Sequence, residues 1–318
     1  MTEWFLTADL GGTKIAAARI ATDGRIAARR TIPTRAEEGM AAVTDRLARL
    51  LVDLSGPESE RPLACGIGTP GIVDAAAGVI RYAVNLPGAQ DYPLAQRLQA
   101  ALQIPVAVDN DLRLHALGES AFGAAVGCQN FIFVSVGTGV GMALMLNGEL
   151  VRGGQFAAGE LGHILIDRSP DAPRCACGRL GCLEAVASGP AMTDRFRRLA
   201  AEDGLGQDAC TADLAKIAAW SPADDRRGEL ARSVIGAGAR ALGEGLSIAV
   251  NLFDPQRIVL GGGVARLGKV WLDGVYAALS AHALRPFLAT DIQPPRLGDD
   301  SPLAGALVLA RQASTARP

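Results

Sequence analysis

Short apolar runs, each ended by glycine or by a polar turn, occupy the first part of the chain. Apolar stretches at 4–10 and 13–21, a turn at 23–24 and a further stretch at 25–32 predict a three-stranded meander. Residues 37–55 carry apolar side chains at helical spacing, which predicts an amphipathic helix. Strands that alternate with helical segments are typical of an α/β protein.

The same kind of meander is expected a second time, with strands at 131–136, 140–146 and 149–152. Between the two meanders the pattern predicts, in order, a strand at 63–68, a helix at 93–103, a strand at 105–109 and a helix at 112–122. Beyond residue 184 the pattern is mainly helical, with an amphipathic stretch at 224–252 and then a strand at 257–260. This restart predicts two similar α/β lobes that face a cleft.

The end of the chain carries a helix-start signal, because Asp299-Asp300-Ser301 precedes Pro302 and an apolar run. We therefore expect a smaller α/β lobe formed by residues 1–111 together with a C-terminal helix at 300–318. The larger α/β lobe is expected to span residues 112–299 and to carry a cysteine-rich loop and a helical insert.

Length, charge and composition limit the classes of function that the chain can have. A chain of 318 residues, 49% hydrophobic and 20% charged, is long enough for two domains with substantial cores. A net charge of -2 indicates no partner among nucleic acids or anionic membranes. The first residues lack the basic stretch of a signal peptide, which predicts a cytoplasmic location. The uncharged span at 120–148 is interrupted by Gln129, Asn130 and several glycines, which favours two buried strands over a membrane helix.

Three glycine-rich turns follow predicted strands. They are Asp9-Leu10-Gly11-Gly12-Thr13-Lys14, Gly137-Thr138-Gly139-Val140-Gly141 and Gly261-Gly262-Gly263. Backbone N–H groups bind phosphate best where no side chain obstructs them, although Gly-Gly pairs are also common in ordinary hairpins. Asp9 favours the functional interpretation, since a carboxylate at the end of an apolar strand needs a partner and Mg²⁺ is a good one.

A cysteine-rich loop predicts a metal site. His163, Cys175, Cys177 and Cys182 form the pattern H-x11-C-x-C-x4-C. Three thiolates and an imidazole make a closed tetrahedral Zn²⁺ site of the structural kind, and the glycines between Cys177 and Cys182 let the chain fold back. The alternative, three unligated thiols in a loop, is disfavoured by the tight spacing. Disulfides are not expected in a reducing compartment.

Polar residues near these motifs are candidates for chemistry. Asn110-Asp111 follows the strand at 105–109 and opens a helix, a place where Asn and Asp are ordinary caps. Acids at the carboxyl end of a strand also lie where α/β folds place ligands. Glu160 lies three residues before His163, and Glu184 lies two residues after Cys182. This polar set beside a metal suggests recognition of a ligand rich in hydroxyls.

The chain resembles the ROK family of repressors, open reading frames and kinases, within the actin-like ATPase superfamily. The resemblance covers nearly the whole chain. It rests on the three glycine-rich turns and on Gly68-Thr69-Pro70-Gly71, Asn110-Asp111, Gly159-Glu160-Leu161-Gly162-His163 and Cys175-Ala176-Cys177-Gly178-Arg179-Leu180-Gly181-Cys182-Leu183-Glu184. It implies an actin-like ATPase (ribonuclease H-like) fold, with two similar α/β lobes around a cleft.

The resemblance implies an ATP-dependent hexose kinase that phosphorylates the 6-hydroxyl, with ATP and transient Mg²⁺ as cofactors and a structural Zn²⁺. Asp111 is the implied catalytic base. The implied sugar contacts are Asn85, Asn110, Glu160, His163 and Glu184, with Gly71 of the tight turn expected beside them. The expected nucleotide contacts are Asp9, Gly11, Gly12, Thr13, Lys14, Gly137, Thr138, Gly139, Gly261, Gly262 and Gly263. Members are usually dimeric or tetrameric, so a homodimer or homotetramer is expected.

Glucose is the leading substrate, because Asn85 in the Asn-Leu-Pro-Gly loop and the intact Glu-x-Gly-His set resemble those of the family's glucokinases. N-acetylglucosamine, N-acetylmannosamine and fructose stay open as alternatives. An unperturbed carboxyl pKa of about 3.9 would leave Asp111 ionised at neutral pH.

Three segments depart from the family pattern. The common Ala-Asn-Ala-Ala after Asn110-Asp111 is Leu112-Arg113-Leu114-His115 here. The usual Asn before Ala-Ala-Gly-Glu is replaced within residues 154–157, and Ala89 stands where an aromatic residue is frequent. These positions are expected to border the sugar pocket, so they bear on substrate identity more than on reaction type.

Two other function classes, a repressor and a non-catalytic sugar-binding protein, are alternatives to the kinase. A sugar-sensing repressor on the same scaffold needs a helix-turn-helix module, normally ahead of the first strand, and only three residues precede Trp4. A non-catalytic sugar-binding protein would differ from a kinase by its lack of ATP turnover. The kinase is the expected class.

Overall fold

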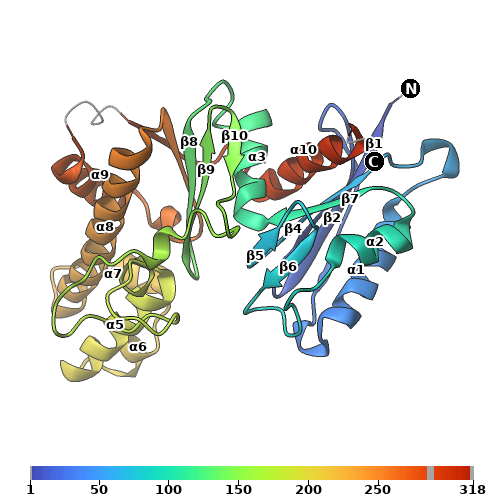
Figure 1. Ribbon diagram of the computed structural model, residues 1–318. Coiled ribbons are helices and arrows are strands. Elements are labelled where there is room, and N and C mark those ends of the chain that lie inside the picture. Colours follow the sequence, from blue (N-terminus) through green and yellow to red (C-terminus); the bar gives the residue numbers. More distant parts are fainter. Residues whose placement is uncertain (1, 285–289, 316–318) are drawn as a thin grey trace. The chain divides into compact units, whose positions relative to one another are not determined.

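The computed structural model describes residues 2–284 and 290–315 (Figure 1). The chain divides into two compact units. The first comprises residues 1–129, 143–158 and 295–318, and the second comprises 130–142 and 159–294. Met1 and residues 316–318, which the expected lobe bounds include, lie outside the described residues.

The division differs from the expected boundary at 111/112 because helix α3 (Asp111–Phe122) lies in the first unit. There α3 runs beside α10 (Ser301–Thr315), as Figure 1 shows. A Cβ atom on Gly305 would lie 1.8 Å from the carbonyl oxygen of Leu114, so only glycine permits this approach. Ser301 is the first residue of α10 rather than its cap, and its hydroxyl donates to the buried carboxylate of Glu119 on α3.

The first sheet has the strand order β3-β2-β1-β4-β7. Its strands are β1 (Trp4–Leu10), β2 (Lys14–Ala21), β3 (Ile26–Pro33), β4 (Cys65–Thr69) and β7 (Val106–Asn110). The first three strands form the predicted antiparallel meander, and β1, β4 and β7 run parallel. Carboxyl ends of parallel neighbours meet at one sheet edge, where ligands of open α/β sheets bind.

The second sheet has the order β10-β9-β8-β11-β12. Its strands are β8 (Phe131–Val136), β9 (Val140–Leu146), β10 (Glu149–Val151), β11 (Arg257–Gly261) and β12 (Asp291–Gln293). Their sequence of meander and parallel strands matches that of the first sheet, which confirms the predicted restart. The short strands β12, β5 (Ile72–Asp74) and β6 (Val79–Tyr82) were not predicted, because three or four residues show no clear alternation.

Both faces of the first sheet are covered. Alternate residues of β1 and β2 enter two separate clusters, as the two-residue period of a strand requires. Leu6, Ala8 and Ile15 pack with α1 (Met40–Leu54) and α2 (Leu94–Leu102), whereas Phe5 and Ile20 pack with α10. The apolar face of α1 is the one that the helical spacing at 37–55 predicts.

The second unit is mainly helical beyond its strands. Its helices are α4 (Glu184–Ala187), α5 (Gly189–Glu202), α6 (Gln207–Cys210), α7 (Leu214–Trp220), α8 (Arg226–Phe253) and α9 (Lys269–His282). The amphipathic stretch at 224–252 is α8, which packs along α9 (Figure 1). Short 3-10 turns lie at Ala36–Glu38, Glu58–Glu60, Leu161–His163, Val264–Leu267 and Gly298–Asp300.

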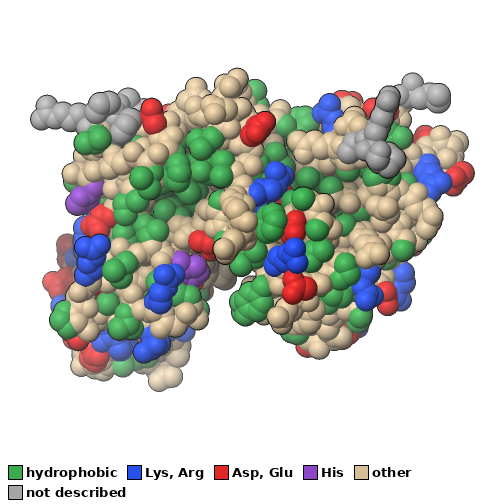
Figure 2. Space-filling view, in the orientation of Figure 1, with side chains coloured by type: hydrophobic (Ala, Val, Ile, Leu, Met, Phe, Trp, Pro, Cys, Tyr) green, Lys and Arg blue, Asp and Glu red, His purple; other side chains and the backbone are tan. Residues whose placement is uncertain are grey.

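Surface charge is mixed in sign. Figure 2 shows acidic and basic side chains next to one another on the visible face, and pairs such as Arg81–Asp91 and Arg198–Glu202 lie 3.1 and 2.8 Å apart. None of the helices within the described ranges is both long enough and apolar enough to cross a bilayer.

Candidate active site

Acidic residues gather at the carboxyl edge of the first sheet. Register pairs Asp9 of β1 with Gly68 of β4, and Gly68 in turn with Asp109 of β7. A Cβ atom on Gly68 would lie 3.6 Å from the Cα of Asp111, where α3 begins. Three segments far apart in sequence therefore bring Asp9 and Asp111 to the same edge of one sheet.

Burial changes the acidity of both carboxyl groups. It raises the pKa of Asp9 to about 6, with the nearby carboxylate of Asp111 adding to the rise and Lys14 opposing it. Burial also raises the pKa of Asp111, against the opposing hydrogen bond from the Leu112 N–H. The expectation of an unperturbed Asp111 is therefore wrong. Two acids that disfavour each other's charge suit a bound cation, which would stabilise both in the ionised form.

Both the oxygen and the nitrogen of the Asn110 side-chain amide are hydrogen-bonded within the protein. Its Oδ1 accepts from the N–H groups of Leu112 and Arg113 at 3.0 and 3.4 Å and caps α3, and its Nδ2 donates to the Gly71 carbonyl at 3.0 Å. A hydrogen bond from the Asn110 side chain also opposes the rise of the Asp111 pKa, so the amide contacts the Asp111 carboxyl as well. The predicted ligand Gly71 thus contributes its carbonyl to positioning Asn110.

The first glycine-rich turn is a tight hairpin between β1 and β2. The Gly11 N–H donates to the Lys14 carbonyl at 2.9 Å, and Thr34 holds the turn by donating its hydroxyl to the Gly11 carbonyl. Since the hairpin uses the Gly11 N–H, that group is not free for a ligand, whereas Thr13 and Lys14 are exposed at the tip. The exposed Asn85 lies against this tip, because a Cβ atom on Gly12 would be 3.2 Å from the Cβ of Asn85.

The second glycine-rich turn, between β8 and β9, is also closed by a backbone hydrogen bond of its first glycine. A carboxylate from a distant segment lies beside it. The Gly137 N–H donates to the Gly139 carbonyl at 2.9 Å. Glu184, at the start of α4, accepts from the Val140 N–H at 3.0 Å. A Cβ atom on Gly139 would lie 2.6 Å from Glu184 Oε2, so glycine at 139 gives this carboxylate access to the turn.

The third turn joins the second within the same unit. Gly262 has φ of +93°, and a Cβ atom there would lie 2.3 Å from the Val136 carbonyl oxygen, so the close approach requires glycine. The start of α5 also reaches this place, since the Gly189 N–H donates to the Gly137 carbonyl at 2.8 Å. The structure thus brings together Gly137, Gly262 and an N-terminal helix end, a combination that suits phosphate.

A cavity of about 630 Å³ in the second unit adjoins this cluster. Its lining includes Thr138, Cys175, Glu184, Ser188 and Pro190. Ser188 is a lining residue that was not predicted; it caps α5 by accepting from the Ala191 N–H at 3.3 Å. The signal was present: Ser188-Gly189-Pro190 is a cap followed by proline in the first turn.

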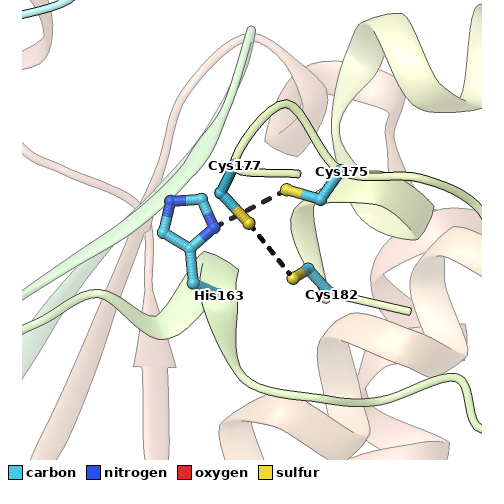
Figure 3. A group of neighbouring side chains, drawn as sticks. All are labelled: His163, Cys175, Cys177 and Cys182. Atoms are coloured by element: carbon cyan, nitrogen blue, oxygen red, sulfur yellow. Dashed lines mark hydrogen bonds between the residues drawn. The ribbon is translucent and has the colours of Figure 1, made fainter. Parts of the chain in front are cut away.

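The predicted metal ligands converge. Figure 3 shows His163, Cys175, Cys177 and Cys182 pointing toward one another, and their ligand atoms all lie within 4.8 Å of each other. Cys177 Sγ and Cys182 Sγ are 3.7 Å apart, as are Cys175 Sγ and His163 Nδ1. A tetrahedral site with Zn–S bonds of about 2.3 Å has sulfurs about 3.8 Å apart, so the four residues fit Zn²⁺.

His163 presents its two nitrogens to different partners. Nδ1 faces Cys175 Sγ, whereas Nε2 lies 3.9 Å from Glu160 Oε2, and the Glu160 side chain is exposed. The backbone N–H and side chain of Arg179 lower the pKa of Cys177 to about 6, which favours the thiolate that binds metal. A metal on Nδ1 would leave Nε2 and Glu160 for a ligand.

Asp109 and Ala89 lie in environments that the sequence does not show. Asp109 is not a candidate acid, because it is fully buried and paired with Arg113 and Arg152 at 2.9 and 2.7 Å. Ala89 belongs to the hydrophobic core of the first unit and is 3% exposed, so its side chain has almost no surface to offer a ligand. The sequence alone does not distinguish an alanine of the core from an alanine that lines a pocket.

Comparison with known proteins agrees with this geometry. The ROK family model matches residues 5–313. The chain belongs to the ROK family. A glucokinase of Halalkalibacterium halodurans is 34% identical over 97% of this chain and 95% of the relative.

Two solved structures extend the likeness to the fold. A ROK hexokinase of Thermus thermophilus has a TM-score of 0.82 and 34% identity over 98% of each chain. A ROK glucokinase of Streptomyces griseus in complex with glucose and AMPPNP has a TM-score of 0.75 and 30% identity over 97% of this chain and 99% of the other. The resemblance, the actin-like fold and the class of ATP-dependent sugar kinase are confirmed.

Proposed function

We propose that the chain transfers the γ-phosphoryl group of ATP to the 6-hydroxyl of a hexose, with glucose as the principal acceptor. The observation that carries this proposal is the pair Asp9 and Asp111 at one sheet edge, both with raised carboxyl pKa values. A carboxylate with a raised pKa is a stronger base than an ordinary one, which suits a group that accepts a proton from a hydroxyl.

In the proposed reaction Asp111 accepts the proton of the sugar 6-hydroxyl. The hydroxyl oxygen forms a bond to the γ-phosphorus while the bond from that phosphorus to the bridging oxygen breaks, and ADP leaves. Mg²⁺ would supply charge neutralisation at the phosphates when bound, and Asp9 would hold it. Asp111 also orients the acceptor, since phosphoryl transfer depends mainly on alignment.

The donor contacts are proposed in two groups. Asp9, Gly12, Thr13 and Lys14 come from the first unit, and Gly137, Thr138, Gly139 and the Gly261–Gly263 turn come from the second. The helix start at Ser188-Gly189 is added to this set because it bonds directly to the Gly137 carbonyl.

The sugar contacts are proposed from polar groups beside Asp111 and beside the cysteine cluster. Asn110 hydrogen-bonds Asp111 through its side chain, and Nε2 of His163 and the carboxylate of Glu160 face each other beside the cysteine cluster. Asn85 and Glu184 complete the set, while Gly71 acts through Asn110. Zn²⁺ is proposed as a structural ion, because four protein ligands leave no open position.

Glucose is favoured over N-acetylated hexoses and fructose by the likeness to glucokinases. We also propose a homodimer or homotetramer, which light scattering during size-exclusion chromatography would measure.

The test is ADP release measured over a sugar panel of glucose, mannose, fructose, N-acetylglucosamine and N-acetylmannosamine. We expect the highest kcat/KM with glucose. Asp111→Asn should lower kcat about 1,000-fold while glucose affinity, measured by calorimetry, changes little. Activity that survives in Asp111→Asn would remove the base assignment, and a preference for an N-acetylated sugar would remove glucose.

A further inference from the structure

A buried ionic network begins at Asp109, two residues before the proposed base. Oδ1 of Asp109 accepts from Arg113 Nη1 at 2.9 Å and from the Asn110 N–H at 2.8 Å. Oδ2 accepts from Arg152 Nε at 2.8 Å. Both oxygens are occupied, so Asp109 holds two guanidinium groups in place instead of acting as an acid.

Arg113 is the centre of this network. Its side chain is 4% exposed, and besides Asp109 it donates to the carbonyls of Val73, Arg152 and Phe156. These acceptors come from β5, from the end of β10 and from the turn that follows it. A planar guanidinium with five donors can serve such a spread of acceptors, whereas a lysine ammonium cannot.

The turn that Arg113 holds has an unusual backbone. Phe156 has φ of +59°, in the left-handed region that bulky residues rarely adopt. The turn is closed by the Phe156 N–H on the Gly153 carbonyl at 3.3 Å and by the Ala158 N–H on the Arg152 carbonyl at 3.2 Å. Such a conformation persists only where the surroundings hold it, and Arg113 bonds the Phe156 carbonyl directly.

Two departures from the family pattern are therefore in contact. Arg113 lies in the segment that replaces Ala-Asn-Ala-Ala, and Phe156 lies in the segment that replaces the usual Asn before Ala-Ala-Gly-Glu. They are 43 residues apart in sequence and hydrogen-bonded to each other. The Arg113 guanidinium thus helps to hold a backbone conformation that is strained for any residue except glycine.

We infer that Arg113 is a positioning residue for the sugar acceptor, which fixes the start of the helix that carries Asp111 and the turn at 153–158 as one rigid piece. The turn leads directly along the chain into Glu160 and His163, two proposed sugar contacts. The inference rests on the proposed function. It predicts that the network sets sugar binding and transfer and leaves ATP binding unaffected.

The test compares Arg113→Ala, Arg113→Lys, Phe156→Gly and the double variant Arg113→Ala with Phe156→Gly. Arg113→Ala should lower kcat/KM for glucose about 10- to 100-fold through both a lower kcat and a higher sugar KM, with the KM for ATP within about twofold of wild type. Arg113→Lys should recover only part of the loss. Phe156→Gly alone should be close to wild type, and in the double variant it should restore activity at least about fivefold, because glycine adopts a positive φ without support.

Arg19→Ala is the matched control. Arg19 is also a buried, ion-paired arginine of the first unit, with Glu60 at 2.6 Å and its guanidinium over the Trp4 ring, and it contacts no proposed site residue. This variant should lower the melting temperature without changing the sugar KM.

Three outcomes overturn the inference: Arg113→Ala kinetics that match those of Arg19→Ala, no recovery in the double variant, or equal losses for sugar and ATP. If Arg113→Ala does not fold, Arg113→Lys alone and combined with Phe156→Gly answers the same question. A wild-type chain that phosphorylates no hexose would instead remove the proposed function, so the two failures are distinguishable.

Discussion

The β1–β2 hairpin and the β8–β9 hairpin occupy equivalent places in two sheets of the same strand order. In each, the N–H of the first glycine, Gly11 or Gly137, closes the turn. They differ in the origin of their carboxylate. The first has Asp9 within its own strand, whereas the second receives Glu184 from 44 residues further along the chain.

The two turns therefore present their carboxylates in different surroundings, although the strand order around them is the same. Asp9 is half-buried near another acid, and both its surroundings and the Asp111 carboxylate raise its pKa to about 6. Glu184 is held by the Val140 N–H, and its Oε1 lies 3.9 Å from Cys175 Sγ of the cysteine cluster. Repeated topology thus supplies two equivalent turns, and they differ in whether the carboxylate is local or comes from a distant segment.

The sharpest test of this contrast is Asp9→Asn. We expect kcat/KM to fall about 100-fold or more, equivalent to about 2.7 kcal/mol, because the cation loses its carboxylate. The melting temperature without ligand should rise. A carboxyl whose folded pKa is raised to about 6 opposes folding once it is ionised, and asparagine removes that charge. Coupled ADP release and thermal unfolding measure the two effects, and an active Asp9→Asn variant would contradict the assignment.

Loss of zinc from the cysteine cluster should lower both stability and activity with glucose. Metal analysis is expected to find about one zinc per chain. Cys182→Ser should lose that zinc, lower the melting temperature and lower kcat/KM for glucose about 10- to 100-fold, since His163 and Glu184 lose their anchor. Cys128→Ser, outside the cluster, serves as the control and should keep its zinc. Full activity in a zinc-free protein would separate the cluster from the sugar site.

Glu184 tests whether the second hairpin depends on its distant carboxylate. Glu184→Ala leaves the Val140 N–H without its acceptor, and we expect kcat/KM to fall about tenfold. Glu184→Gln keeps an acceptor oxygen and should lose about threefold. Steady-state kinetics with each substrate varied in turn would measure both variants. Equal losses for alanine and glutamine would show that charge, and not the hydrogen bond, is what the site uses.

A change of pH is expected to have a modest effect as well. Protonated Asp9 cannot hold a cation, so kcat/KM should be constant above pH 7 and fall as pH decreases through about 6, roughly fourfold lower at pH 5.5. Because a bound cation favours the ionised acid, higher Mg²⁺ should move the fall to lower pH. A profile that is flat to pH 5 at low Mg²⁺ would contradict the raised pKa.

Much of the candidate site was predictable because its signals are local. The spacing of His163, Cys175, Cys177 and Cys182 needs only a short loop to close, so the pattern and the geometry agree. The raised pKa of Asp111 was not predictable, since it arises from burial beneath segments far away in sequence. The same holds for Asp109, which has the appearance of a catalytic acid until Arg113 and Arg152 are placed beside it.

Apolar periodicity by itself determined the order of the longer strands and helices and the repetition of the meander, and the spacing of His and Cys determined the candidate metal ligand set. These properties depend on neighbours within a few residues, where the chain has few alternatives. Only the tertiary structure decided which carboxylate serves which turn, which acids are buried and that Arg113 supports Phe156. Those pairings join residues that are tens of positions apart, and their energies depend on burial and hydrogen-bond geometry that no local pattern records.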